Sequence, residues 1–133
     1  MRTIVGLILF GIFVIASPAF ASNDDFDGTK PLLCASIEAL DCDPGEDCVR
    51  GIPEVMGAPQ FVRIDFAKNE ITGPKRTTAI RMIEKDDDQI VLQGYEIGLG
   101  WTLAIDRATG NMRATFAGGT AAFIVFGACT AYP

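Results

Sequence analysis

Apolar and polar residues alternate along much of the second half of the chain. Val62, Ile64 and Phe66 are separated by single polar residues, and the same spacing recurs at 101–106 and 112–116. Successive side chains of a β-strand point to opposite faces, so this period of two predicts strands with one buried and one solvated face. The segment 121–129 is apolar at nearly every position, which is typical of a central strand covered on both faces.

Turn-forming residues divide this region into short strands. Turns are predicted where charged residues or glycines interrupt the spacing, at 68–70, 85–88, 98–100, 107–111 and 118–119. The strands between them are predicted at 60–66, 77–84, 89–97, 101–106, 112–116 and 121–129. Residues 32–40 fit either a helix face or a strand, and the β pattern downstream favours the strand. Residues 43–47 are expected to form a turn, and 50–59 an irregular segment.

Short strands joined by tight turns predict an all-β fold. We expect a small antiparallel meander of roughly six to eight strands that forms a barrel or a folded-over sandwich, because closure hides the edge strands. Residues 31–133 suffice for a single β domain. The expected core residues lie on the apolar faces of the strands: Val62, Ile64, Trp101, Leu103, Ile105, Met112, Phe116, Phe123 and Val125.

The amino-terminal segment has the layout of a secretory signal. Arg2 precedes an apolar run, and Ala19-Phe20-Ala21 supplies the small residues that a signal peptidase requires. Residues 1–21 are therefore expected to be a cleaved signal peptide, with export to the periplasm or secretion from a bacterium. Residues 22–30 are acidic and are expected to be a mobile leader.

Four cysteines follow this segment, and an oxidising compartment favours their pairing as disulfides. Cys42 and Cys48 flank a Pro-Gly turn, so a bridge between them closes a short local loop. By elimination, Cys34 pairs with Cys129, which ties the first element to the last strand. Such bridges help a chain of this size, whose core alone supplies little stability.

Composition argues against most catalytic chemistry. The chain has no histidine, which removes Ser-His and Cys-His nucleophile pairs and imidazole metal ligands. The formal net charge of −6 disfavours nucleic acid and anionic lipid as partners, and no membrane association is expected after signal cleavage. Glu96 and Asp106 are a weak candidate pair for a carboxylate-based hydrolase. We predict no enzymatic activity, no cofactor and no metal site, and we read the acidic residues at 23–28 as a solvated leader rather than a calcium loop.

The chain contains a set of short motifs: Leu32-Leu33-Cys34, Cys42, Cys48, Pro59 to Phe66, Leu92-Gln93-Gly94, Gly100 to Asp106, Thr109-Gly110 and Phe123 to Cys129. As a set, these motifs resemble a group of small, uncharacterised exported bacterial β proteins. The resemblance covers nearly all of residues 22–133 and implies a periplasmic setting without naming an activity. A small secreted β barrel with a cysteine in its last strand is also similar, by architectural analogy, to periplasmic lysozyme inhibitors.

Three classes of function fit these observations to different degrees. The first is a non-catalytic binding or interaction protein, for which the acidic surface suits a basic partner. The alternative is a carrier of a small apolar ligand inside the barrel. A barrel of this size can instead fill with side chains, and Phe66, Met82, Trp101, Met112, Phe116 and Phe123 are available to fill it. A hydrolase is the least favoured class.

Overall fold

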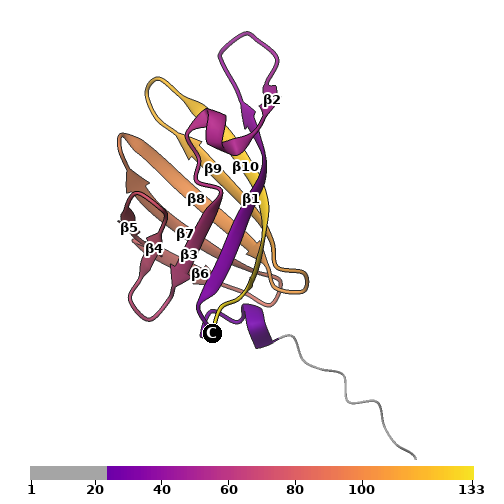
Figure 1. Ribbon diagram of the computed structural model, residues 1–133, viewed down its shortest axis with the longest axis vertical. Coiled ribbons are helices and arrows are strands. Elements are labelled where there is room, and N and C mark those ends of the chain that lie inside the picture. Colours follow the sequence, from indigo (N-terminus) through magenta and orange to yellow (C-terminus); the bar gives the residue numbers. More distant parts are fainter. Residues whose placement is uncertain (1–23) are drawn as a thin grey trace, which may run out of the picture.

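The computed structural model describes residues 24–133, which form one curled antiparallel β-sheet with two short 3₁₀ helices (Figure 1). The expected signal peptide and its cleavage site lie outside the described residues. None of the described helices is long and apolar enough to cross a membrane. The elements are η1 (Asp24–Phe26), β1 (Leu32–Asp41), β2 (Val49–Gly51), η2 (Pro53–Met56), β3 (Phe61–Asp65), β4 (Glu70–Thr72), β5 (Thr77–Ala79), β6 (Met82–Lys85), β7 (Gln89–Glu96), β8 (Leu99–Asp106), β9 (Asn111–Ala117) and β10 (Ala122–Ala131).

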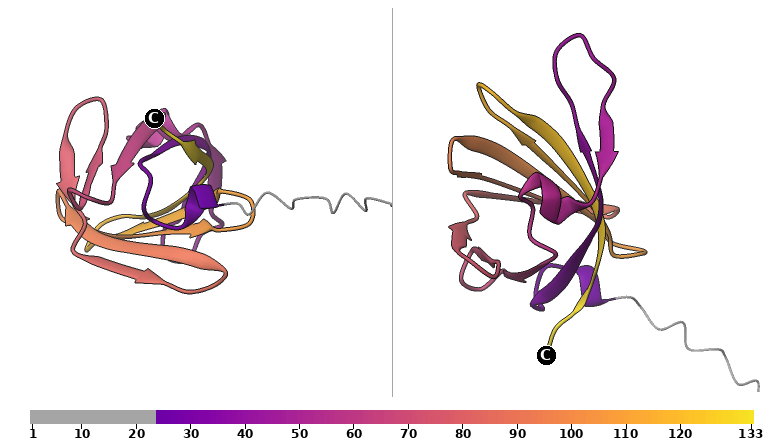
Figure 2. Two further views of the ribbon diagram at one scale, coloured as in Figure 1. Left: turned by 90° about the horizontal axis from the view of Figure 1, so that it is seen from below. Right: turned by 45° about the horizontal axis from the view of Figure 1, so that its top comes forward.

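Nine strands follow the spatial order β5-β4-β3-β1-β10-β9-β8-β7-β6, and β2 pairs separately with the end of β1. Figure 2 shows this sheet curling round on itself into a half-barrel. The all-β prediction is therefore confirmed, but the strand number is higher than expected. The order also departs from a plain meander, because the first strand inserts between β3 and the last strand.

Residues 32–40 form the strand that the sequence left open. β1 pairs with β10 on one side and with β3 on the other, and the Cys34 and Cys129 positions face each other in the β1–β10 register. They form the predicted disulfide, with a Cα–Cα separation of 3.9 Å. The register shifts between Ser36 and Glu38, which places a bulge at Ile37. The bridge thus joins the first and last strands of the sheet at its centre.

The single strand predicted over 77–84 is wrong. Two strands occupy this segment, and the chain changes partners between them at Ile80 and Arg81. The Ile80 N–H donates to the Asn69 carbonyl on the β4 side at 2.8 Å, whereas the Arg81 N–H donates to the Gln93 carbonyl of β7, also at 2.8 Å. β5 and β6 are consequently the two edges of the curled sheet, although they are consecutive in the chain.

Two further short strands, β4 and β2, account for the remaining strands that the sequence did not predict. β4 begins at Glu70, where the sequence predicted a turn but where the residue already pairs with Asp65 of β3, and it continues over 71–72, for which no element was predicted. β2 lies in the region predicted as turn and irregular, just after the second disulfide. That bridge joins Cys42 to Cys48 with a Cα–Cα separation of 4.2 Å, as predicted.

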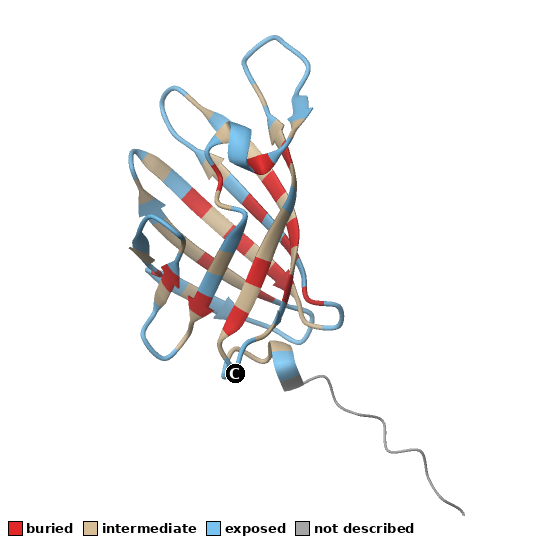
Figure 3. Ribbon diagram, in the orientation of Figure 1, coloured by how far each residue is buried: buried red, intermediate tan, exposed pale blue. Residues whose placement is uncertain are grey.

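The core lies on the concave face of the sheet, and along the longer strands such as β8 and β9 its buried residues alternate with half-buried or exposed residues of the other face (Figure 3). Six of the expected core residues are buried, and Val62, Phe116 and Phe123 are half-buried. Met82, expected among the residues that fill the interior, is 41% exposed on the edge strand β6. On β10, Ile124 and Phe126 face away from Val125 and are half-buried.

One end of the half-barrel is covered by the segment that precedes β1. Arg107 donates from Nε to the Phe26 carbonyl at 3.2 Å and from Nη1 to the Asp86 carbonyl at 2.7 Å. Phe26 itself packs against the core. The structure places 24–30 against this end of the sheet, which we call the closed end. The mobility of residues 22–30 stays a prediction.

Candidate functional site

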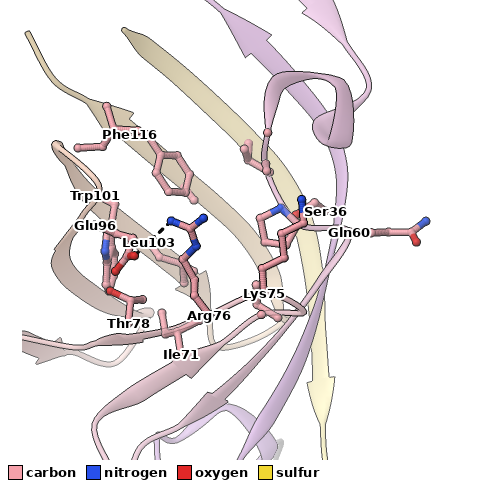
Figure 4. A pocket seen from close by; sticks show the side chains of 18 of the residues that line it. Ser36, Gln60, Ile71, Lys75, Arg76, Thr78, Glu96, Trp101, Leu103 and Phe116 are labelled. Atoms are coloured by element: carbon pink, nitrogen blue, oxygen red, sulfur yellow. Dashed lines mark hydrogen bonds and ion pairs between the residues drawn. The ribbon is translucent and has the colours of Figure 1, made fainter. Parts of the chain in front are cut away.

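The opposite end of the half-barrel contains a cavity of about 490 Å³. Its rim is made by three connections: the β4–β5 hairpin, the β7–β8 turn, and the segment that runs from η2 to β3. Its walls come from the concave face of the strands below them. We call this end the open end, and Figure 4 shows the cavity from close by.

The walls are built from apolar side chains of neighbouring strands. In the sheet register, Leu103 of β8 lies opposite Ala114 of β9, and Ala114 lies opposite Val125 of β10. One step nearer the rim, Phe116 and Phe123 stack with ring centroids 4.5 Å apart. Other wall residues, from β3, β4, β8 and β9, are Val62, Ile71, Trp101 and Met112.

The same strand faces are tightly filled towards the closed end. Ile64, Ile90 and Ile105 are all fully buried there. Ile105 is two residues beyond Leu103 on the same face of β8, so one strand contributes to both the packed core and the cavity wall. The small side chain of Ala114, in the middle of its row, leaves space that a larger residue would occupy. Val62, Phe116 and Phe123 are only half-buried because all three line the cavity.

Four charged side chains line the rim: Glu54 from η2, Lys75 and Arg76 from the β4–β5 turn, and Glu96 from the end of β7. Arg76 Nη1 lies 3.5 Å from Glu96 Oε1, and both side chains are partly exposed (Figure 4). This ion pair links the β4–β5 turn to the end of β7 across the rim. The turn that carries Arg76 is closed by a hydrogen bond from the Gly73 N–H to the Arg76 carbonyl at 2.9 Å.

Trp101 contributes its carbon surface to the cavity. Its indole lies over Gly94 of β7, where an added Cβ would come within 2.2 Å of the ring. The indole Nε1 is buried and has no hydrogen-bond partner among the described residues. An unpaired buried donor lowers the stability of the folded state by roughly 1–3 kcal/mol. The indole of Trp101 is therefore held in place by packing rather than by polar contacts.

The weak hydrolase pair is not brought together. Glu96 lies at the cavity rim, whereas Asp106 ends β8 at the closed end, and these are opposite ends of the β7–β8 hairpin. Within residues 24–133, no polar or charged residue is buried and no cluster of histidine, cysteine or carboxylate side chains could hold a metal ion.

Carboxyl groups with shifted pKa values lie at the closed end, away from the cavity. The backbone N–H and hydroxyl of Thr109 hold the pKa of Asp106 below its ordinary value, and the backbone N–H groups of Asp88 and Gln89 do the same for Asp86. Hydrogen bonds from Thr29 lower the pKa of Asp27. These carboxylates accept hydrogen bonds from the backbone N–H groups of the turns that contain them.

Sequence reasoning found the aromatic and aliphatic wall but missed the rim. The sequence predicts no element for the segment that contains Lys75 and Arg76, and of β4 only Glu70 lies in a predicted element, the turn at 68–70. The dipeptide Gly73-Pro74 was the available signal, because it is typical of a tight turn between two strands.

No family model, no curated protein and no solved structure matches this chain. The resemblance to exported bacterial β proteins therefore stays a prediction. The function has to be argued from the cavity itself and from the two disulfides, which are typical of proteins in an oxidising, extracytoplasmic environment.

Proposed function

We propose that this protein binds a small apolar ligand in the cavity at the open end and carries it without chemical change. The single observation behind the proposal is an apolar cavity of about 490 Å³ that opens beside the packed core. Ligand pockets typically have volumes of about 300–1,000 Å³, are lined mostly by apolar and aromatic side chains, and have a few polar groups at defined places. The wall and rim described above have that composition.

The cavity reverses the ranking of the two leading functional hypotheses from the sequence, which were binding to a partner and carrying an apolar ligand. Side chains could have filled the interior completely, and then binding at the outer surface would be the better proposal. Instead Phe116, Phe123 and Trp101 line open space. We therefore place the carrier function ahead of binding to another protein.

We further propose that the protein works in the periplasm or outside the cell. Both disulfides support an oxidising compartment, and the apolar amino-terminal run followed by Ala19-Phe20-Ala21 supports export. A carrier in such a compartment would move poorly soluble molecules through an aqueous space.

Titration with the apolar dye Nile red tests the carrier function. Trp101 is the only tryptophan of the chain and lines the cavity, so its fluorescence should change as the dye binds. Ala114→Leu places a larger side chain in the wall and should weaken dye binding. The matched control is Ala117→Leu, which adds the same group on the exposed face of the same strand. Equal affinity of both variants would refute binding in the cavity.

Binding to a basic protein is the second candidate. Val49, Ile52 and Val55 are 64%, 64% and 83% exposed, and they follow the acidic loop closed by Cys42 and Cys48. An apolar centre beside acidic residues suits a partner of opposite charge. Capture experiments with the native protein and with Val55→Asp test this candidate, since a specific basic partner should be recovered only by the native protein.

A further inference from the structure

Two consecutive cationic residues lie at the rim of the apolar cavity. Lys75 and Arg76 are neighbours in the β4–β5 turn, both are exposed, and both line the opening. The chain as a whole carries an excess of acidic residues, with a formal net charge of −6. A local pair of positive charges on such a background is a feature that the carrier function alone does not require.

Both cations are available to a ligand. Lys75 forms no ion pair with any of the residues 24–133, and Arg76 has only the Glu96 carboxylate at 3.5 Å. The side chains of that pair are 49% and 34% exposed. Ion pairs with this exposure are weak, so a second carboxylate can compete for the guanidinium. Arginine is also suited to the task, because its planar group can bind a carboxylate through two parallel hydrogen bonds.

The acidic residues of the rim are arranged differently. Glu54 and Glu96 come from separate elements, η2 and β7, and Glu96 is already paired with Arg76. The two cations, in contrast, share one turn and can meet a single head group together.

We propose that the ligand is a single-chain amphiphile with a carboxylate head group. Its alkyl chain lies against Leu103, Phe116 and Val125, and its carboxylate binds between Lys75 and Arg76. This inference rests on the proposed carrier function, since it assumes that the cavity is the binding site. It adds the ligand class and the residues that select it.

Three probes with the same alkyl chain separate the head group from the tail. Binding of laurate, lauryl alcohol and lauryltrimethylammonium is measured by Trp101 fluorescence, below the concentrations at which they form micelles. Laurate should bind most tightly, and its advantage over the alcohol should shrink as salt is added, because exposed charges are screened. If no probe binds, the carrier function itself fails. If the alcohol or the cation binds as tightly as laurate, the carrier function stands and the carboxylate preference is overturned.

Variants of the rim test the assigned residues. Lys75→Gln and Arg76→Gln should each weaken laurate binding roughly two- to fivefold and leave the affinity for lauryl alcohol unchanged. Glu96→Gln should strengthen laurate binding, because it removes a negative charge and frees the guanidinium. Lys68→Gln is the matched control: it removes the same charge from the exposed β3–β4 turn and should change neither affinity. Equal effects of Lys75→Gln and Lys68→Gln on laurate would overturn the role of the rim.

Discussion

Removal of the two disulfides should have very different effects on stability. The Cys34–Cys129 bridge spans 95 residues of sequence, whereas the Cys42–Cys48 bridge spans 6. A bridge stabilises the folded state mainly by restricting the unfolded chain, and this effect grows with the logarithm of the loop length. The chain-entropy relation gives about 4.7 kcal/mol for the long loop and about 2.2 kcal/mol for the short one. The expected difference is therefore about 2.5 kcal/mol.

The different burial of the two cysteine pairs should further increase the difference in stability between the two double variants. Cys34 is fully buried and Cys129 is 8% exposed in the core, while Cys48 is exposed. Alanine in place of the buried pair deletes two sulfur atoms from a packed interior, which adds a cavity cost to the lost cross-link. At Cys42 and Cys48 the same substitution removes little buried contact.

The measurement compares Cys34→Ala/Cys129→Ala with Cys42→Ala/Cys48→Ala in urea. Unfolding is followed by the fluorescence of Trp101, and the free energy of unfolding is extrapolated to zero denaturant. Extrapolated values are compared rather than midpoints, because loss of a cross-link also expands the unfolded chain and raises the denaturant slope. Each double variant is the control for the other. Equal free energies of unfolding would refute the reasoning from loop length and burial.

Three further predictions address packing, titration and export. Gly94→Ala should destabilise by about 1–3 kcal/mol in urea, because its Cβ would clash with Trp101, whereas Gly119→Ala, in open space, should not. The pKa of Asp106 in the folded protein lies below its ordinary value of 3.8, so the ionised carboxylate stabilises the fold. Asp106→Asn should therefore have a lower free energy of unfolding than the native protein; this difference should be complete above pH 3.8 and should vanish as the pH falls through the folded-state pKa. Amino-terminal sequencing of the exported protein should give Ser22 as the first residue. Exported protein that still carries residues 1–21 would contradict cleavage there.

The local pattern of apolar and polar residues was sufficient to predict the strands that have a regular period of two. Trp101, Leu103 and Ile105 alternate with polar or small residues, and each is buried on the concave face as the spacing predicts. The turn at Arg107 and Gly110 was also recognisable, because its residues favour tight turns and its neighbours are strongly periodic. Both disulfides followed from sequence separation and elimination, since one pair flanks a local turn and only one other pairing then remains.

Long-range pairing could not be derived in the same way. The break at Ile80 and Arg81 exists because one backbone N–H bonds towards β4 and the next towards β7, and these partners are distant in the sequence. β4 is only three residues long, so its apolar pattern is too short to separate from a turn. The bulge at Ile37 likewise depends on the register with β10.

The sequence by itself determined the all-β class, the alternation of buried and exposed residues, the cysteine pairing and the absence of histidine chemistry, because these depend on composition and on neighbours along the chain. Only the tertiary structure decided that the interior holds a cavity. Whether Phe116 and Phe123 fill a barrel or line a space depends on the curvature of the sheet and on the size of residues opposite them, such as Ala114. The meeting of Arg76 and Glu96 across the rim depends on the same curvature, which brings the β4–β5 hairpin close to β7.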